Sequence, residues 1–156
     1  TVELKAAGSS ALGIGIIEVL DMDEGTPFLF NISTRADVKA GARRAVAGFI
    51  INGNVPRQVL IRGRGPSIPL SGTLDDPTLE LFSGPTSILS NDNWQEAANV
   101  ADIAATGRAP GRFLESAILT TLQPGAYTVF LASNTNQTGI GIIEVLDLSG
   151  GSIESN

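Results

Sequence analysis

One run of nine residues occurs twice in the chain. Residues 13–21 and 139–147 both read GIGIIEVLD, and the Thr-Val-x-Leu pattern of residues 1–4 recurs at residues 128–131. The offset is 126 residues in the long run and 127 in the upstream pair, so one connecting residue has been inserted. A copy of this size comprises two strands and their connection, which is the size of a β-hairpin. The sequence therefore predicts one module plus a duplicated terminal hairpin.

Short β-rich segments separated by turn residues make up the rest of the chain. The 18 glycines and 8 prolines recur between them, which is typical of strands and turns. Strands are expected at residues 1–5, 13–20, 28–33, 46–51, 58–64, 78–82, 87–90, 115–122, 127–132 and 139–146. The pattern favours an all-β fold, a β-sandwich of jelly-roll type.

A single short helix is expected at about residues 94–106. Asn93 can cap its first turn, and Glu96 follows three residues later, in the reciprocal position of a capping box. Gly107 stands where a left-handed residue often ends a helix. We expect this helix to cover one end of the sandwich.

The two copies differ on one face of their first strand. The strands read TVELK at residues 1–5 and TVFLA at residues 128–132, so the valine and leucine are kept while phenylalanine and alanine become glutamate and lysine. Because side chains alternate across a strand, one whole face changes from apolar to charged. We expect the first strand of the N-terminal copy to have one face in water and that of the C-terminal copy to be covered on both faces.

The apolar side chains of the N-terminal copy require a partner. Leaving each of them in water forgoes roughly 1.5–3 kcal/mol. Three docking places are open: the chain's own domain, a preceding module of the same polypeptide, or a neighbouring subunit. Donation to a neighbour would build an open fibre. The expected assembly residues are Val2, Leu4, Ile14, Ile16, Ile17, Val19 and Leu20.

Composition excludes several classes of function. The net charge of −6 and the pI of about 4.5 argue against nucleic-acid binding. The chain contains neither cysteine nor histidine, which removes thiolate metal sites and Ser-His-Asp triads. No apolar run approaches the roughly 18 residues of a membrane-spanning helix, so membrane insertion is not expected.

Several motifs between residues 31 and 148 occur together. They are NISTRADV (31–38), QVLIRGRGPSIPLSGTLDDPTLELF (58–82), SNDNW (90–94), ADIAATGRAP (101–110), ESAILTTLQPGAYT (115–128) and TGIGIIEVLDL (138–148). In combination they resemble a module of about 125 residues that recurs, often in tandem, in large secreted bacterial proteins. The resemblance implies an extracellular β-rich module without known catalytic residues. The run PGAYTVFL (124–131) also resembles β-sandwich domains appended to secreted peptidases.

The resemblance also predicts how the chain is divided. In the tandem pattern an EVLD strand is followed directly by the NISTR segment of the next unit, and residues 13–38 reproduce this junction. The predicted parts are an extra hairpin (1–22), a linker or first strand (23–30), the sandwich module (31–148) and a tail (149–156). The rest of the preceding module is not in this sequence, and we expect another subunit to supply it.

Two groups of polar residues are candidate sites. Hard oxygen ligands suited to calcium are offered by Asp75, Asp76, Asn91, Asp92 and Asn93. Asn and Asp also serve turns and helix caps without any metal, and no other cofactor is expected.

The second group is a structural ion pair. Glu18 and Glu144 lie inside apolar strands, where a carboxylate needs a partner. Arg62 and Arg64 are two residues apart, hence on one strand face, and are the expected partners.

The sequence thus predicts a non-catalytic structural subunit of an extracellular filament or surface fibre, whose partner is a second copy of itself. The alternative is a secreted adhesion or binding module of a tandem-repeat surface protein, with a glycan or another surface ligand. A secreted hydrolase is a third class, but it would need paired acidic groups in a cleft, and no such pair is predicted. No catalytic residue is expected.

Overall fold

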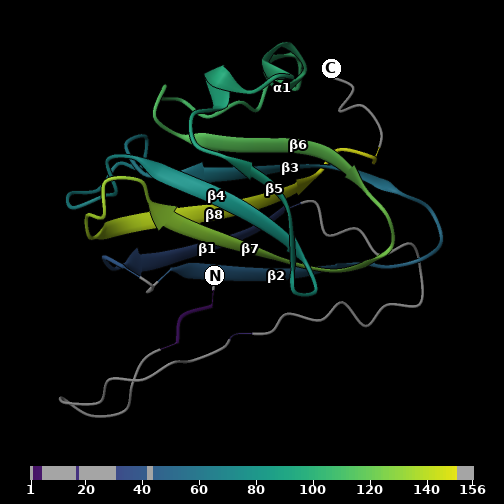
Figure 1. The fold of residues 1–156 in the computed structure, drawn as a ribbon, viewed down its shortest axis with the longest axis horizontal. Coiled ribbons are helices and arrows are strands. Elements are labelled where there is room, and N and C mark those ends of the chain that lie inside the picture. Colours follow the sequence, from purple (N-terminus) through teal and green to yellow (C-terminus); the bar gives the residue numbers. More distant parts are fainter. Residues whose placement is uncertain (1, 5–16, 18–30, 42–43, 151–156) are drawn as a thin grey trace.

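The fold is a sandwich of two four-stranded antiparallel sheets in a computed structural model (Figure 1). The structure describes residues 2–4, 17, 31–41 and 44–150. The first sheet contains β1 (Asn31–Val38), β8 (Gly139–Asp147), β3 (Arg57–Arg64) and β6 (Ser116–Leu122), in that order. The second contains β2 (Ala45–Ile51), β7 (Gly125–Ser133), β4 (Pro77–Ser83) and β5 (Thr86–Asn91).

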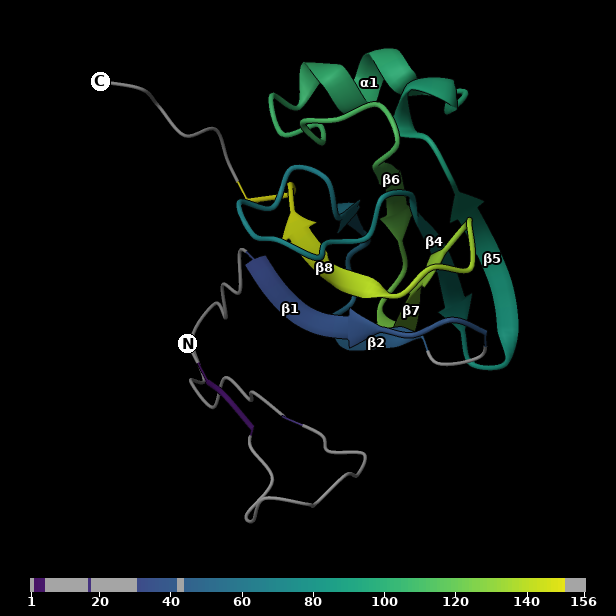
Figure 2. The ribbon, with the colours of Figure 1, turned by 90° about the vertical axis from the view of Figure 1, so that its left-hand side faces the viewer.

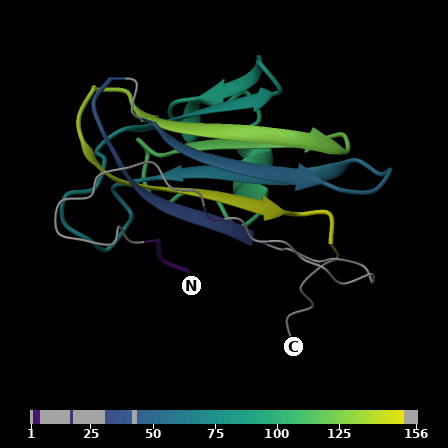
Figure 3. The ribbon, with the colours of Figure 1, turned by 90° about the horizontal axis from the view of Figure 1, so that it is seen from below.

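This strand order is that of a jelly roll. The β1–β2 unit runs antiparallel to the β8–β7 unit, with β1 on β8 in one sheet and β2 on β7 in the other (Figure 3). In the same way β3 pairs with β6, and β4 pairs with β5. The predicted all-β sandwich of jelly-roll type is therefore confirmed.

Alternating side chains of both sheets form the core. In β2 every second residue is buried, from Ala45 to Ile51, while the residues between them are exposed. The same alternation places Val59 and Ile61 of β3 between the sheets. Side chains of period two from two facing sheets are the usual core of such a sandwich.

The duplicated strands do not form a hairpin in their C-terminal copy, so that prediction is wrong. β7 lies in the second sheet, between β2 and β4, whereas β8 lies in the first sheet, between β1 and β3. Residues 134–138 therefore cross from one sheet to the other. We call β7 and β8 the central strand pair, because each has a hydrogen-bonded strand on both sides.

The helical residues lie within the predicted range, but the α-helix is shorter than expected. A 3₁₀ turn (η1, Trp94–Glu96) precedes a six-residue helix (α1, Val100–Ala105). Asn93 makes no capping hydrogen bond to the backbone; its side chain donates to Glu96 instead. Gly107 has the expected positive φ of 65°.

The helix covers the outer face of the first sheet, not an end of the sandwich (Figure 2). Ile103, which is fully buried, packs there with Leu60, Ala117 and Leu146 of β3, β6 and β8. This second small core explains why β8 is apolar on both faces: one face meets the other sheet, and the other face meets the helix.

The N-terminal predictions fall mostly outside the described residues. Of the strands expected at 1–5 and 13–20, the structure describes only residues 2–4 and 17, and none of these is in a strand. Residues 18–30, and with them the predicted linker, lie outside the description. The strand expected at 28–33 is observed from Asn31 to Val38.

Candidate assembly site

The central strand pair shows which environment the duplicated sequence is suited to. Val129 and Leu131 of β7 are fully buried in the core, and Ile143 of β8 is 1% exposed. Their counterparts in the N-terminal copy, residues 1–21, are Val2, Leu4 and Ile17. These three side chains are 66%, 56% and 47% exposed. Positions that are buried in one copy are thus about half exposed or more in the other.

The remaining assembly residues are Ile14, Ile16, Val19 and Leu20, which lie outside the described residues. Their counterparts in β8 divide between two faces. Val145 belongs to the core between the sheets, and Leu146 packs under the helix. Ile140 and Ile142 are half-buried.

The two glycines of β8 lie very close to atoms of neighbouring segments. A Cβ on Gly139 would lie 2.7 Å from the backbone of Thr73 and Leu74, which pairs with the start of β8. A Cβ on Gly141 would lie 2.6 Å from the Leu131 side chain. Real Cβ contacts are not that short. A side chain at position 139 would therefore collide with backbone, whereas one at position 141 would require the end of the Leu131 side chain to shift. The N-terminal copy keeps both glycines, as Gly13 and Gly15.

The changed face of β7 points away from the core. Phe130 lies on the outer face of the second sheet, half-buried, with Phe82 edge-on at 5.2 Å and the Arg44 guanidinium at 5.6 Å from its ring. Glu3 and Lys5 of the N-terminal copy would occupy this outer face, where charge is tolerated. The core face is unchanged between the copies.

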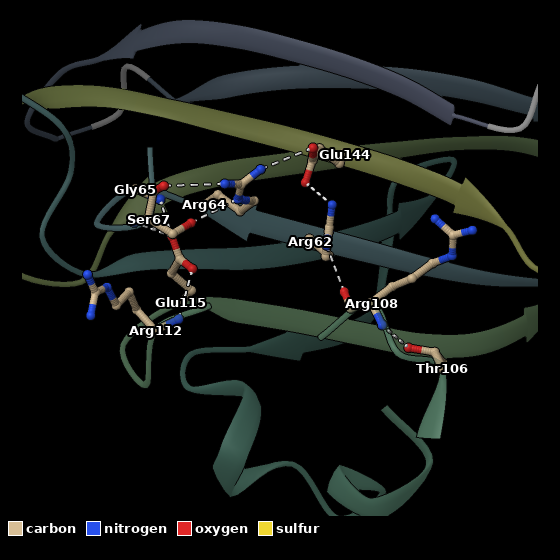
Figure 4. A network of polar contacts seen from close by, with 9 residues as sticks. All are labelled: Arg62, Arg64, Gly65, Ser67, Thr106, Arg108, Arg112, Glu115 and Glu144. Atoms are coloured by element: carbon tan, nitrogen blue, oxygen red, sulfur yellow. Dashed lines mark hydrogen bonds and ion pairs between the residues drawn. The ribbon is translucent and has the colours of Figure 1, made fainter. Parts of the chain in front are cut away.

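The structure brings Glu144, Arg62 and Arg64 together on the outer face of the first sheet (Figure 4). The Arg62 guanidinium lies 2.7 Å from the Glu144 carboxylate, and that of Arg64 lies 3.4 Å from it. Arg62 is the registered cross-strand partner of Glu144, and it also donates to the carbonyl of Arg108. The pair therefore marks the register of β8 on β3, while Glu18 lies outside the described residues.

A second buried carboxylate was not singled out from the sequence. Glu115 is fully buried and accepts hydrogen bonds from the backbone N–H groups of Gly65 (2.9 Å), Ser67 (3.0 Å) and Arg112 (3.2 Å). Arg64 also binds Ser67. The carboxylate thereby holds the 65–67 loop against the start of β6 (Figure 4). The sequence signal for it is a carboxylate at the first position of the strand predicted at 115–122.

The calcium candidates are only partly brought together. Asn134 donates its side-chain amide to both Asp76 (3.2 Å) and Asp92 (3.0 Å), so the two carboxylates share one neutral donor. Burial, with the nearby Asp76 and Glu96 carboxylates, raises the pKa of Asp92 above its ordinary value. One oxygen each of Asp76, Asp92 and Asn93 is buried without a hydrogen bond.

The other two calcium candidates, Asp75 and Asn91, do not join this group. Asp75 is exposed. The side chain of Asn91 accepts a hydrogen bond from the backbone N–H of Ala117 and donates one to the carbonyl of Asn93. In the part of the chain that the structure describes, no group of three or more Asp, Glu, Cys or His side chains could hold a metal. Calcium binding stays a prediction.

An open groove of about 1070 Å³ runs beside the helix, over the outer face of the first sheet. Leu119 and Leu146 form part of its floor, and Asp102 and Arg108 lie on its helix side. Asn31, where β1 begins, and Leu148 also line it, so both ends of the sandwich module reach this place.

Comparisons with known proteins found few matches. No family model matches the chain, and no curated protein matches it. Among solved structures, the chain is similar to the pre-peptidase C-terminal domain of collagenase from Bacillus anthracis, with 13% identity and a TM-score of 0.48. The match covers 74% of this chain and 89% of that one. Among the described residues, no helix is both long enough and apolar enough to cross a membrane.

Proposed function

We propose that this chain is a non-catalytic structural subunit of an extracellular filament or surface fibre, in which residues 1–21 of one copy enter the sandwich of a neighbour. One observation carries the proposal. The N-terminal copy repeats the core-facing residues of the two central strands, yet Val2, Leu4 and Ile17 are exposed. Burying these three side chains would gain roughly 1.5–3 kcal/mol each. The extracellular location follows from the resemblance of residues 31–148 to modules of secreted bacterial proteins.

The fold supports a particular way of joining. Because β7 and β8 lie in different sheets, a donated copy would add one strand to each sheet of its acceptor. A donated hairpin on a single sheet edge would leave one strand of the copy without its matching neighbours. The donated strands would meet β2 and β4 on one side of the sandwich and β1 and β3 on the other.

The acceptor must have room for the donated pair. In this structure the chain's own β7 and β8 occupy the positions between β2 and β4 and between β1 and β3. A donated copy is therefore buried only if the acceptor's central strand pair is displaced or missing. The fitting partner is therefore a sandwich of the same kind whose central pair has been displaced, or a module that ends before β7. Either arrangement links successive modules through a shared strand pair.

Assembly can be tested by sedimentation and electron microscopy over a range of protein concentrations. The wild-type chain should form polymers as concentration rises, and deletion of residues 1–22 should leave monomers. Leu4→Asp should also abolish polymers, because its counterpart Leu131 is fully buried. Lys5→Ala is the matched control, since the counterpart of Lys5 is Ala132 on the outer face, and it should still polymerise. A wild-type chain that stays monomeric at all concentrations contradicts the proposal.

An adhesion or binding module is the second candidate, and the outer face of the second sheet favours it. Val46 and Ile50 of β2 are 52% and 66% exposed there, with Phe82 and Phe130 half-buried beside them. Apolar groups gathered on one sheet face are common at docking surfaces. A binding module should remain folded and monomeric with or without residues 1–22, and Val46→Ser with Ile50→Ser should reduce its retention on a glycan array.

A further inference from the structure

We infer that residues 1–21 can replace the central strand pair of their own sandwich, so that the chain encodes the same jelly roll twice: once as residues 31–148, and once as a circular permutant made of residues 1–122. The inference rests on the strand match behind the proposed function. It concerns folding within one chain, and it holds or fails independently of polymer formation.

The order of strands makes the replacement geometrically simple. Asn31, the first residue of β1, pairs with Leu146 near the end of β8. The counterpart of Leu146 is Leu20, and ten residues, 21–30, separate Leu20 from Asn31. Paired strands lie about 4.8 Å apart, whereas ten residues can span about 33 Å. A β8 copy could therefore turn back onto β1 of its own chain. Ends that lie this close are the condition under which circular permutation is tolerated.

The residues that the β8 position requires are present in the copy, and those of β7 are represented from Thr128 onward. The strand needs glycine at position 139, where the Thr73–Leu74 backbone is close, and a small residue fits best at 141. It also carries core side chains at 143 and 145 and a carboxylate between Arg62 and Arg64. All nine residues of this run are identical in residues 13–21. In the strand before it, Val2 and Leu4 keep the two fully buried side chains of β7.

Two contacts explain why β7 and β8, and not their N-terminal copy, occupy the central strand positions in this structure. Phe130 packs edge-on against Phe82 and under Arg44, and its counterpart Glu3 cannot make the same ring contacts. Asn134, in the connection between β7 and β8, donates to both Asp76 and Asp92. The corresponding connection, AAGSSAL at residues 6–12, contains no amide side chain that could bridge them. The resident pair is preferred, and the N-terminal copy is a substitute.

A pair of equivalent glycine substitutions tests the inference in the full-length chain. Gly139→Val places side-chain atoms against the Thr73–Leu74 backbone, which cannot yield as a flexible side chain would. We expect Gly139→Val to retain cooperative thermal unfolding, because residues 1–21 take over, and Gly13→Val alone to unfold like the wild type. The double variant should unfold at least about 5 °C below Gly139→Val, which is beyond small surface effects for a domain of this size. Equal melting temperatures of Gly139→Val and the double variant, at any level, overturn the inference.

An engineered disulfide then locates the substitute strand. Thr34 of β1 is the registered partner of Ile143, whose counterpart is Ile17. Registered antiparallel partners have Cα atoms about 4.5–5.5 Å apart, within the range of a disulfide. The chain has no cysteine of its own. Thr34→Cys with Ile17→Cys should cross-link in the Gly139→Val background, whereas Ser33→Cys with Ile17→Cys, facing the other way, should not.

The size of the cross-linked species decides where the substitute comes from. A cross-linked monomer supports replacement within one chain. A cross-linked dimer, or no cross-link above that of the Ser33→Cys control, overturns it. Polymerisation of the wild-type chain is measured separately, so a failure of the filament proposal would leave this result readable.

Discussion

Glu144 joins two arginines on a largely covered sheet face. Its side chain is 10% exposed, and those of Arg62 and Arg64 are 17% and 24% exposed. Removing one partner of a buried ion pair leaves the other charge uncompensated. We expect Glu144→Ala to lower the free energy of unfolding by about 3–5 kcal/mol. Urea denaturation should be measured in a chain without residues 1–22, so that Glu18 cannot substitute.

The more exposed pair of Arg57 and Asp147, at 4.0 Å, is the control for Glu144. Asp147→Asn should change the free energy of unfolding by about 0–1 kcal/mol, as for other solvent-screened pairs. If the two substitutions cost the same, Glu144 does not hold the register of β8 in the way described.

The ionised carboxylate of Asp92 lowers the stability of the folded protein, whereas a carboxylate in a stabilising ion pair raises it. Burial, Asp76 and Glu96 raise its pKa in the folded state, so the folded protein binds a proton there more readily than the unfolded chain does. The ionised carboxylate therefore costs stability above the raised pKa, and the cost disappears as pH falls through that pKa. Asp92→Asn should raise the melting temperature at pH 7, with a gain that shrinks toward acid pH. The exposed Asp75→Asn should show no such trend.

Two glycines in strands of opposite sheets should respond differently to alanine. A Cβ on Gly63 of β3 would collide with the Ser116 hydroxyl and lie 2.8 Å from Leu131, whereas one on Gly48 of β2 would meet only an ordinary contact at 3.8 Å. Gly63→Ala should cost about 1–3 kcal/mol of unfolding free energy by overpacking. Gly48→Ala should not destabilise. Chemical denaturation of both variants checks the contrast, and equal costs would contradict the packing described for Gly63.

At the scale of elements, the sequence predicted the strands better than their pairing. Each of the eight strands overlaps a predicted one, because β-rich runs and turn residues are local signals. The strand expected at 28–33 ends too early, because the inward positions of β1 after Ile32 are Thr34 and Ala36, which are only weakly apolar. The pairing of β7 with β8 was wrong, because a polar connection of this length suits both a hairpin and a crossing between sheets.

Some contacts of the candidate site could be predicted from the sequence, and others could not. The Arg62–Arg64–Glu144 contact followed from alternation along two strands, which is local. Glu115 and Asn134 act on residues 48–50 and 42–58 positions away in sequence, through contacts that only the strand order brings together. Sequence patterns do not contain that order.

The helix makes a testable contribution to the covering of the first sheet. Ile103 is fully buried among Leu60, Ala117 and Leu146. Ile103→Ala should lower the free energy of unfolding by about 2–5 kcal/mol, as for other large-to-small core changes. Ala101, exposed on the same helix, provides Ala101→Ser as a surface control with little effect. A cost for Ile103→Ala no larger than the control's would show that the helix does not seal this face.

At the level of the whole molecule, we propose that the N-terminal copy can serve as a second set of central strands. A jelly roll suits such a duplication, because the end of β8 lies beside the start of β1 and the final pair can be supplied from either end of the chain. Modules joined in this way would share strands rather than touch only at their surfaces.

Hydrogen exchange followed by mass spectrometry tests this claim most directly. Residues 13–21 and 139–147 have the same sequence but different neighbours, so their flanking residues distinguish the two sets of peptides. Each sandwich has one place for the strand pair. We therefore expect amides of residues 14–20 to gain protection as protein concentration rises, while residues 140–146 lose protection in step. Fast exchange of residues 14–20 at every concentration, beside a protected β8, would contradict this claim.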